Sequence, residues 1–294
     1  SDSFRVVTGG ADGNRDWVTL RNYRDDNGLN ADINIRTHDI ATLGLWGPKA
    51  VNALGNFIDP NEIDIQNFPF VTAKNLTLNL SGGKKVDVWA ARISYVGESG
   101  WEIYFNNNKD DGLALYDSLL EVGVVPVGIE TYANSRRLEK SFRLQGADLE
   151  TEYTAIEAAI QRPLVKEADF HGKAAHLSHR EENPCAILCT MTLDDLNVSG
   201  VPRYPVGISP IIDPATGEVP IDSKGRRSYT TGMSYCPSIK KFVVMGYLPK
   251  ELAIQGKQLL IEYFNEDDDG VYPITVQIVG KGSLYDPNNE RVRS

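Results

Sequence analysis

The segment that most constrains the fold is residues 92–105, RISYVGESGWEIYF. Its pattern predicts a strand, a tight glycine-flanked turn that presents Glu98, and a return strand of alternating character. Side chains alternate across a strand, so the return strand has an apolar face and a polar face. The apolar face is expected to carry Trp101, Ile103 and Phe105. The segment therefore predicts a hairpin with one face against a core.

The carboxylate of Glu98 at the end of this hairpin has two interpretations. A rigidly held carboxylate suits a planar ligand edge with two parallel N–H donors, such as that of a pterin, because its two oxygens accept both. The alternative is a surface hairpin with a solvated glutamate. The spacing of the residues leaves both interpretations open.

Charge and cysteine content narrow the class of protein. The 294 residues carry a net charge of −10 with a pI near 5.0, which argues against a general nucleic-acid binder, since phosphate contacts need a basic surface. No apolar run approaches the roughly 20 residues of a membrane span. The three cysteines are too few for a disulfide framework. We expect a reducing compartment, the cytoplasm or, in a eukaryote, the mitochondrial matrix.

The chain opens with Ser-Asp-Ser directly before the strand-like run FRVV, without an initiator methionine. We expect a chain that starts in this way to be a fragment or one piece of a larger polypeptide.

Periodicity and turn residues predict the elements of the first 182 residues. Strands are expected at Phe4–Val7, Ala31–Arg36, Val71–Leu80 and Val86–Val96, and helices at Trp17–Tyr23, Gly112–Gly123 and Gly128–Leu144, with a turn and a helix in Leu43–Leu54.

From Pro184 onward the pattern changes to short β-rich runs between glycine, proline and aspartate clusters, which is typical of a small barrel or sandwich. These runs are Ala186–Leu193, Phe242–Leu248, Gln258–Phe264 and Tyr272–Val279. We place a domain boundary near residue 183.

Two motifs suggest sites that the rest of the sequence does not support. The glycine-rich TGGADGN (8–14) invites a dinucleotide loop, but no Tyr-x-x-x-Lys pair and no parallel βαβ series follow, so a turn is expected. His171, His176 and His179 cluster without a fourth ligand of suitable spacing, so we expect exposed helical histidines and no metal.

Cys185 and Cys189 share one face of a predicted strand and are expected to be core thiols.

Four basic residues lie on the predicted helix in NSRRLEKSFR (134–143). They fit a solvated helix face with i,i+4 pairing. They also fit a surface that attracts an anionic tail, such as the glutamates of a folate. The sequence favours the solvated face.

Several segments together resemble the folate-dependent aminomethyltransferase family, which includes the T-protein of the glycine cleavage system. The matching segments, in order, are GLWGPKA (44–50), RISYVGESGWEIYF (92–105), RRLEKSFRLQGADL (136–149) and VKEADFHGKAAH (165–176). The form of the hairpin, Arg-Leu-Glu-Lys, and the ending SLYDPNNERVRS look more like the folate domain of dimethylglycine and sarcosine dehydrogenases or oxidases. In those proteins this domain follows an N-terminal half that carries FAD.

The resemblance implies an α+β fold, with α/β folate-binding units in a cloverleaf followed by a C-terminal antiparallel β-barrel. The expected parts are the rear of a truncated α/β unit (1–38), the main folate-binding domain (39–182) and the barrel (183–294).

The resemblance implies that Glu98 holds the pterin ring and that Tyr95 lines its pocket. Arg137 would act near the site or brace it. Thr8 stands where T-proteins usually have asparagine, and it is the fourth expected binding residue. The Ala-Arg-Asp that precedes Arg-Leu-Glu in T-proteins is missing, since TYANSRRLEK stands here.

The activity implied is transfer of a one-carbon unit from an N-methyl amine to tetrahydrofolate, giving 5,10-methylenetetrahydrofolate. Relatives use an aspartate in a segment upstream of this chain as the catalytic carboxylate, so no catalytic residue is assigned here. The expected partners are folate and a flavin-dependent dehydrogenase domain or subunit, with neither nucleic acid nor membrane. Two alternatives remain: a non-catalytic folate-binding or interaction module, and a folate-dependent demethylase of the same fold.

Overall fold

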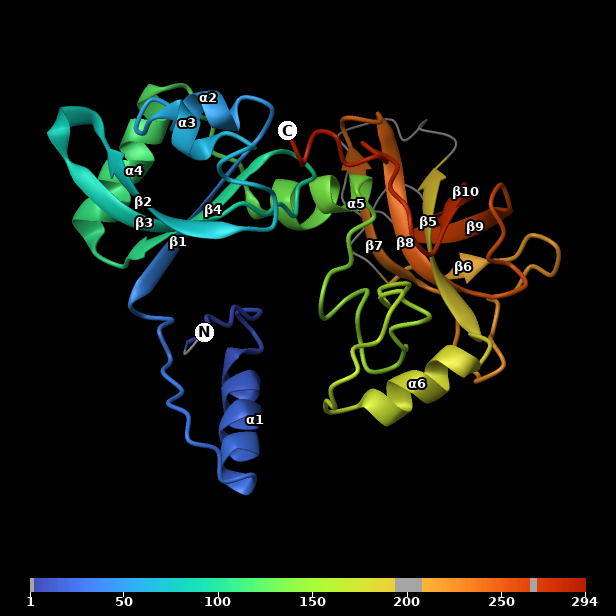
Figure 1. Cartoon of the computed structure of the whole chain (residues 1–294). Helices are drawn as coiled ribbons and strands as arrows, with labels where there is room; N and C mark the ends of the chain where they lie inside the picture. The colour runs from blue at the N-terminus through green and yellow to red at the C-terminus, as the bar shows by residue number, and fades with distance from the viewer. Residues whose placement is uncertain (1–2, 194–207, 265–268) are drawn as a thin grey trace. The chain divides into compact units, whose positions relative to one another are not determined.

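The computed structural model describes residues 3–193, 208–264 and 269–294. The chain divides into two compact units (Figure 1). Unit 1 comprises residues 1–45, 51–92 and 101–124, and unit 2 comprises residues 46–50, 93–100 and 125–294. The boundaries expected near residues 38 and 183 remain predictions.

The described residues of unit 1 include a four-stranded sheet with the strand order β1-β4-β3-β2. The strands are β1 (Ile40–Trp46), β2 (Ala73–Asn79), β3 (Lys85–Ala91) and β4 (Gly100–Asn106). β3 is antiparallel to β2 and to β4. In β4 the expected alternation is confirmed, since Trp101, Ile103 and Phe105 are buried while Glu102 and Tyr104 are half-buried. One face of this sheet therefore carries the core of unit 1.

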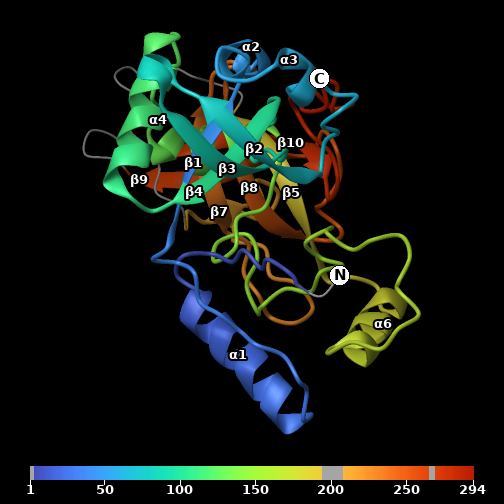
Figure 2. The ribbon, with the colours of Figure 1, turned by 60° about the vertical axis from the view of Figure 1, so that its left-hand side comes forward.

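The helices of unit 1 are α1 (Gly13–Asp26), α2 (Ala50–Leu54), α3 (Pro60–Ile63) and α4 (Lys109–Glu121), with a short 3₁₀ turn η1 (Ser81–Gly83). α4 lies beside the sheet in both views (Figure 1 and Figure 2), and Gly112 in it sits close to the Phe105 ring. The Asn108 side chain caps its first turn by accepting from the Asp111 N–H. The helix stops before Gly123, whose φ of +86° suits a C-terminal glycine.

Unit 2 contains a β-rich sheet whose described strands follow the order β6-β9-β10-β5-β8-β7. They are β5 (Ala186–Leu193), β6 (Ile211–Ile212), β7 (Thr230–Cys236), β8 (Lys241–Pro249), β9 (Gln258–Phe264) and β10 (Asp269–Val279). The paired strands are antiparallel. Residues of β8 enter two separate core clusters, with Val244 and Leu248 in one and Val243 and Met245 in the other. The sheet is thus covered on both faces, which explains its continuous apolar runs.

This sheet is curled, and its described strands do not close into a complete barrel. The two edge strands approach through an isolated bridge between Pro210 and Tyr229, which precede β6 and β7. The predicted β-barrel is accordingly a barrel-like antiparallel sheet that stays open.

Three helical segments precede or flank the sheet: a π-helical turn η2 (Thr131–Arg136), α5 (Arg137–Glu139) and α6 (Lys173–Glu181). The helix expected at 128–144 ends early, because Ser141 has a φ of +53°, outside the range of a right-handed helix.

Two predicted strands are wrong. Phe4–Val7 and Ala31–Arg36 have no strand conformation, and Phe4 is 86% exposed. A short extended segment needs a neighbouring strand to bond its backbone groups, and neither segment pairs within the described part of the chain. The helix expected at Trp17–Tyr23 is confirmed within α1.

The core-thiol prediction is confirmed for one of the two cysteines, and the predicted exposure of the helical histidines is wrong for His176 and His179. Cys189 is buried in β5, whereas Cys185 precedes the strand and is half-buried. His176 and His179 lie on α6 and are half-buried rather than exposed. The described residues contain no cluster of potential ligands that could hold a metal ion. None of the described helices combines the length and apolarity needed to cross a membrane.

Candidate functional site

The site forms around the loop that joins β3 and β4. The first strand of the predicted hairpin ends at Ala91, where it pairs with Glu102, so the tight turn is wrong and a longer loop takes its place. The loop bends at Gly97, which has a φ of +75°, and any Cβ there would collide with the side chain of Lys140. Glycine is required at this position because it adopts a positive φ readily and has no Cβ to collide with Lys140.

Glu98 in this loop is buried, with 6% of its surface exposed, so a solvated glutamate is also wrong. Its Oε1 accepts from Arg136 Nη2 at 2.7 Å and from the Tyr285 hydroxyl at 2.5 Å. Arg291 Nη1 lies 3.9 Å from Oε2. A buried carboxylate needs such charged and hydrogen-bonded partners, and here they come from a helix and from the C-terminal segment.

Arg136 is itself fixed from several directions. Its Nη1 donates to Glu139 Oε2 at 2.7 Å and also to the Ser238 hydroxyl. Its guanidinium stacks 5.0 Å from the centre of the Tyr285 ring. Glu139 is fully buried, so the arginine bridges two buried carboxylates with little freedom to move.

Lys140 anchors the C-terminal segment. Its Nζ donates to the Tyr285 carbonyl at 3.1 Å, to the Asp286 carbonyl at 2.7 Å and to Asn289 Oδ1 at 2.9 Å. Burial lowers the pKa of this ammonium, and the negative charge of Asp286 opposes that shift. The lysine that packs against Gly97 thus also holds the backbone of Tyr285.

Aromatic rings line the same loop. Tyr95 lies 5.3 Å from the ring of Tyr132 and stacks at 5.9 Å on Phe142, and Tyr132 stacks on Trp46 at 5.4 Å. The Tyr95 hydroxyl donates to the Arg143 carbonyl at 2.9 Å. Burial raises the pKa of Tyr95 to about 12, so its hydroxyl stays protonated at neutral pH.

Ser94, the residue before Tyr95, has a buried Oγ without a hydrogen-bond partner in the described structure. A buried hydroxyl of this kind needs a ligand or a water molecule to satisfy it.

Arg137 lies deeper than the loop and is 1% exposed. Its Nη1 forms an ion pair with Asp148 and donates to the Phe142 carbonyl at 3.1 Å, and its Nε donates to the Ala133 carbonyl at 2.9 Å. The Asp148 carboxylate also accepts from the Thr231 hydroxyl. These contacts join the helical segment to β7, which is what a bracing residue does.

The basic residues of 134–143 are therefore not a solvated face. Arg136, Arg137 and Lys140 are largely or fully buried, and each bonds a carboxylate or a carbonyl. The prediction of a solvated helix face is wrong because this helical turn packs between the Glu98 loop and the sheet of unit 2.

The fourth predicted residue, Thr8, is exposed in unit 1, in the stretch before α1. The structure places Glu98, Tyr95 and Arg137 within unit 2. Residue-based reasoning missed three further members, namely Arg136, Lys140 and Tyr285. The signal for Tyr285 was its place in SLYDPNN near the C-terminus, but only the fold brings residue 285 to residue 98.

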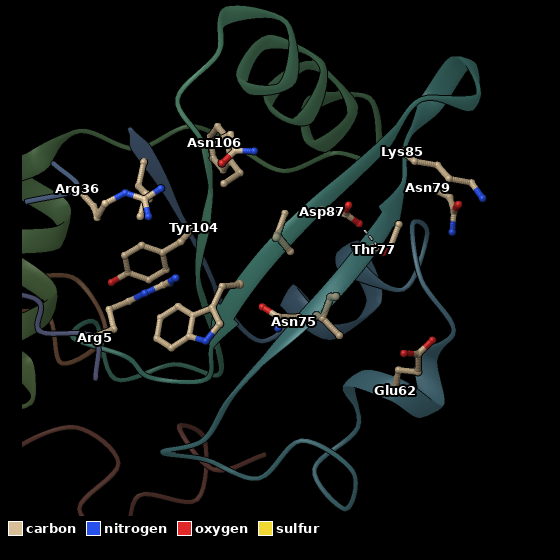
Figure 3. A pocket seen from close by; sticks show the side chains of 15 residues that line it. Arg5, Arg36, Glu62, Asn75, Thr77, Asn79, Lys85, Asp87, Tyr104 and Asn106 are labelled. Carbon is tan, nitrogen blue, oxygen red and sulfur yellow. Dashed lines mark hydrogen bonds between the residues drawn. The ribbon is translucent and has the colours of Figure 1, made fainter. Parts of the chain in front are cut away.

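A separate open cavity of 890 Å³ lies on the sheet of unit 1 (Figure 3). Its lining is mostly polar and includes the hydrogen-bonded pair Thr77 and Asp87. Arg5 lies 4.0 Å above the Trp89 ring and 5.7 Å from that of Tyr104. The cavity contains none of the predicted binding residues.

The chain is similar to known proteins, and the similarity includes the Glu98 loop. The model of the family described as the GCVT N-terminal domain matches residues 1–167, more than half of the chain. The chain belongs to this family. The match includes the loop, η2 and α5, and so most of the groups around Glu98.

Curated relatives extend the similarity over almost the whole chain. Human mitochondrial dimethylglycine dehydrogenase is 28% identical over 288 residues, which cover 93% of this chain and 29% of that protein. The aminomethyltransferase of Symbiobacterium thermophilum is 30% identical over 265 residues, covering 87% of this chain and 64% of that one. The chain thus spans less than a third of the length of the dehydrogenase.

The fold is also similar to a solved structure, the glycine cleavage system aminomethyltransferase T from Bartonella henselae. The TM-score is 0.69 at 21% sequence identity, with 91% of this chain and 65% of that chain covered. This supports the aminomethyltransferase fold, with mixed helices and sheets.

Proposed function

We propose that this chain is a tetrahydrofolate-binding domain of the aminomethyltransferase type, in which Glu98 holds the pterin ring. The observation that carries the proposal is the buried Glu98 carboxylate, fixed on Oε1 by Arg136 and Tyr285 beside a cluster of aromatic rings. A pterin offers two adjacent N–H donors in one plane, and a fixed carboxylate is a matching acceptor.

The residues present fit this ligand. Oε2 of Glu98 has lone pairs for an N–H donor, the ring of Tyr95 would supply an apolar wall, and Ser94 Oγ, which has no hydrogen-bond partner among the described residues, would supply a polar contact. Arg137 would brace the site through its ion pair with Asp148. Thr8 stays a proposed binding residue.

We further propose that the one-carbon donor is an N-methyl amine of the dimethylglycine or sarcosine type and that the product is 5,10-methylenetetrahydrofolate. The similarity to dimethylglycine dehydrogenases over 93% of the chain supports this choice. The domain's task in this reaction is to position the folate and exclude water. FAD would be carried by a flavin-dependent partner domain or subunit, and no residue of this chain is assigned as the catalytic carboxylate.

Titration with tetrahydrofolate in oxygen-free buffer tests the binding proposal. Wild-type protein should bind, and Glu98→Ala should lose most of its affinity. Glu152→Ala is the matched control, because Glu152 also accepts a tyrosine hydroxyl, that of Tyr229 at 3.1 Å, but is exposed. Failure of the wild type to bind would refute the folate proposal, and equal binding by wild type and Glu98→Ala would refute the role of Glu98.

A further inference from the structure

The acceptor capacity of Glu98 is unevenly used. Each carboxylate oxygen offers two lone pairs. Oε1 already accepts two short hydrogen bonds, from Arg136 at 2.7 Å and from Tyr285 at 2.5 Å. On Oε2 the described residues place only Arg291 Nη1, at 3.9 Å. Glu98 therefore has lone pairs available on Oε2 but has none left on Oε1.

A ligand edge with two parallel N–H groups needs one lone pair on each oxygen. For such a ligand to bind, one of the two internal donors must leave Oε1. The requirement follows from counting acceptors, and it rests on the function proposed above.

The two donors differ in how firmly they are held. Arg136 keeps bonds to Glu139 and Ser238 whichever way Glu98 is used, and its departure would leave a buried carboxylate without its counter-charge. The Tyr285 hydroxyl donates only to Glu98 among the described contacts. Its side chain is half-buried, so the released hydroxyl can bond water.

The backbone of Tyr285 need not move in this exchange. Its N–H donates to the Glu139 carbonyl at 3.0 Å, and its own carbonyl accepts from Lys140. A rotation of the side chain that moves the hydroxyl away from Oε1, and with it the ring that Arg136 contacts, would free the lone pair.

We propose that the Tyr285 hydroxyl occupies, in the ligand-free protein, the Oε1 lone pair of Glu98 that a pterin N–H takes on binding. Tyr285 is then an internal competitor that satisfies the buried carboxylate in the absence of ligand and lowers the affinity for folate. Its removal should tighten binding, which is opposite to the effect expected of a residue that orients Glu98 for the ligand.

Calorimetric titration with tetrahydrofolate tests this with Tyr285→Phe, which keeps the ring and removes the hydroxyl. We expect a Kd about threefold to tenfold lower than that of the wild type, because the ligand no longer breaks a hydrogen bond to a charged group. Tyr229→Phe, which also deletes a hydroxyl bonded to a carboxylate, should leave the Kd unchanged. Arg136→Gln should weaken binding, since Arg136 is the donor that stays.

A variant pair separates the exchange from a general change in structure. In a Glu98→Ala background, Tyr285→Phe should give no gain in affinity, because the contested lone pair is gone. Wild-type binding with equal or weaker binding by Tyr285→Phe overturns the exchange and leaves the folate proposal standing. A gain that persists without Glu98 also overturns the exchange. No binding by the wild type refutes the proposed function and, with it, this inference.

Discussion

The buried ion pair of Arg137 with Asp148 gives the sharpest prediction about stability. Arg137→Met keeps most of the length of the side chain and removes its charge and its donors. The two side chains are 1% and 0% exposed, so the substitution leaves the Asp148 carboxylate in the interior without its ion-pair partner. The carbonyls of Ala133 and Phe142 lose a donor in the same step.

Breaking a buried pair by removing one partner costs about 3–5 kcal/mol. A native domain has a free energy of unfolding of roughly 5–15 kcal/mol, so the variant should lose a large part of it. An exposed pair of the same chemistry provides the scale: Arg36 and Asp39 lie 2.7 Å apart with side chains 59% and 58% exposed. Arg36→Met should cost less than about 1 kcal/mol.

Urea denaturation followed by circular dichroism measures both variants against the wild type, and the tetrahydrofolate titration is repeated on each. A stability loss below about 1 kcal/mol for Arg137→Met would contradict the bracing role argued from burial. If Arg137→Met folded with normal stability yet bound no folate, the residue would be a ligand contact instead.

Two further predictions concern thiols and acid. Burial raises the pKa of Cys189 to about 12 and also raises the pKa of Cys236, so a thiol reagent near neutral pH should label only the half-buried Cys185 quickly in the native protein and all three thiols in urea; rapid labelling of two native thiols would contradict the packing. Burial alone would raise the pKa of Glu157, but its bonds to Arg226 and Thr154 outweigh burial and lower the pKa from 4.5 to about 2. Because the folded pKa is the lower one, this stabilisation is present above about pH 4.5 and is lost as the pH falls toward 2. Glu157→Gln should therefore show a shallower loss of stability over that range than the wild type, and an unchanged acid profile would rule out this carboxylate as a source.

The sequence predicted elements well where a local pattern determines them. The alternation of apolar and polar residues predicted the buried face of β4, because side chains in a strand point to its two faces in turn. Gly123 predicted the end of α4, because glycine readily adopts the left-handed backbone found there. The strand prediction failed for Phe4–Val7, which contains two β-branched valines but pairs with no strand among the described residues. A run of this kind specifies an extended chain only when a partner supplies the other half of each hydrogen bond.

The candidate site combines residues that the sequence singled out with residues that it did not. Motif resemblance singled out Glu98 and Tyr95 from short segments. The hydrogen-bond donors that satisfy Glu98 come from Arg136 and from Tyr285, which is 187 positions away. No local pattern encodes such a contact, and the burial of Lys140 depends on which surface covers its helix. Long-range packing, not residue type, decided both.

The dependence of Glu98 on Tyr285 has a consequence for how the chain folds. During synthesis the carboxylate leaves the ribosome long before its tyrosine and before the oxygens that hold Lys140 in place. Contacts of such large sequence separation form late, since a long loop must close first. The loop at Glu98 should thus be the last part of unit 2 to become ordered. Substitutions in the final ten residues should disorder this loop before they affect the β-sheet.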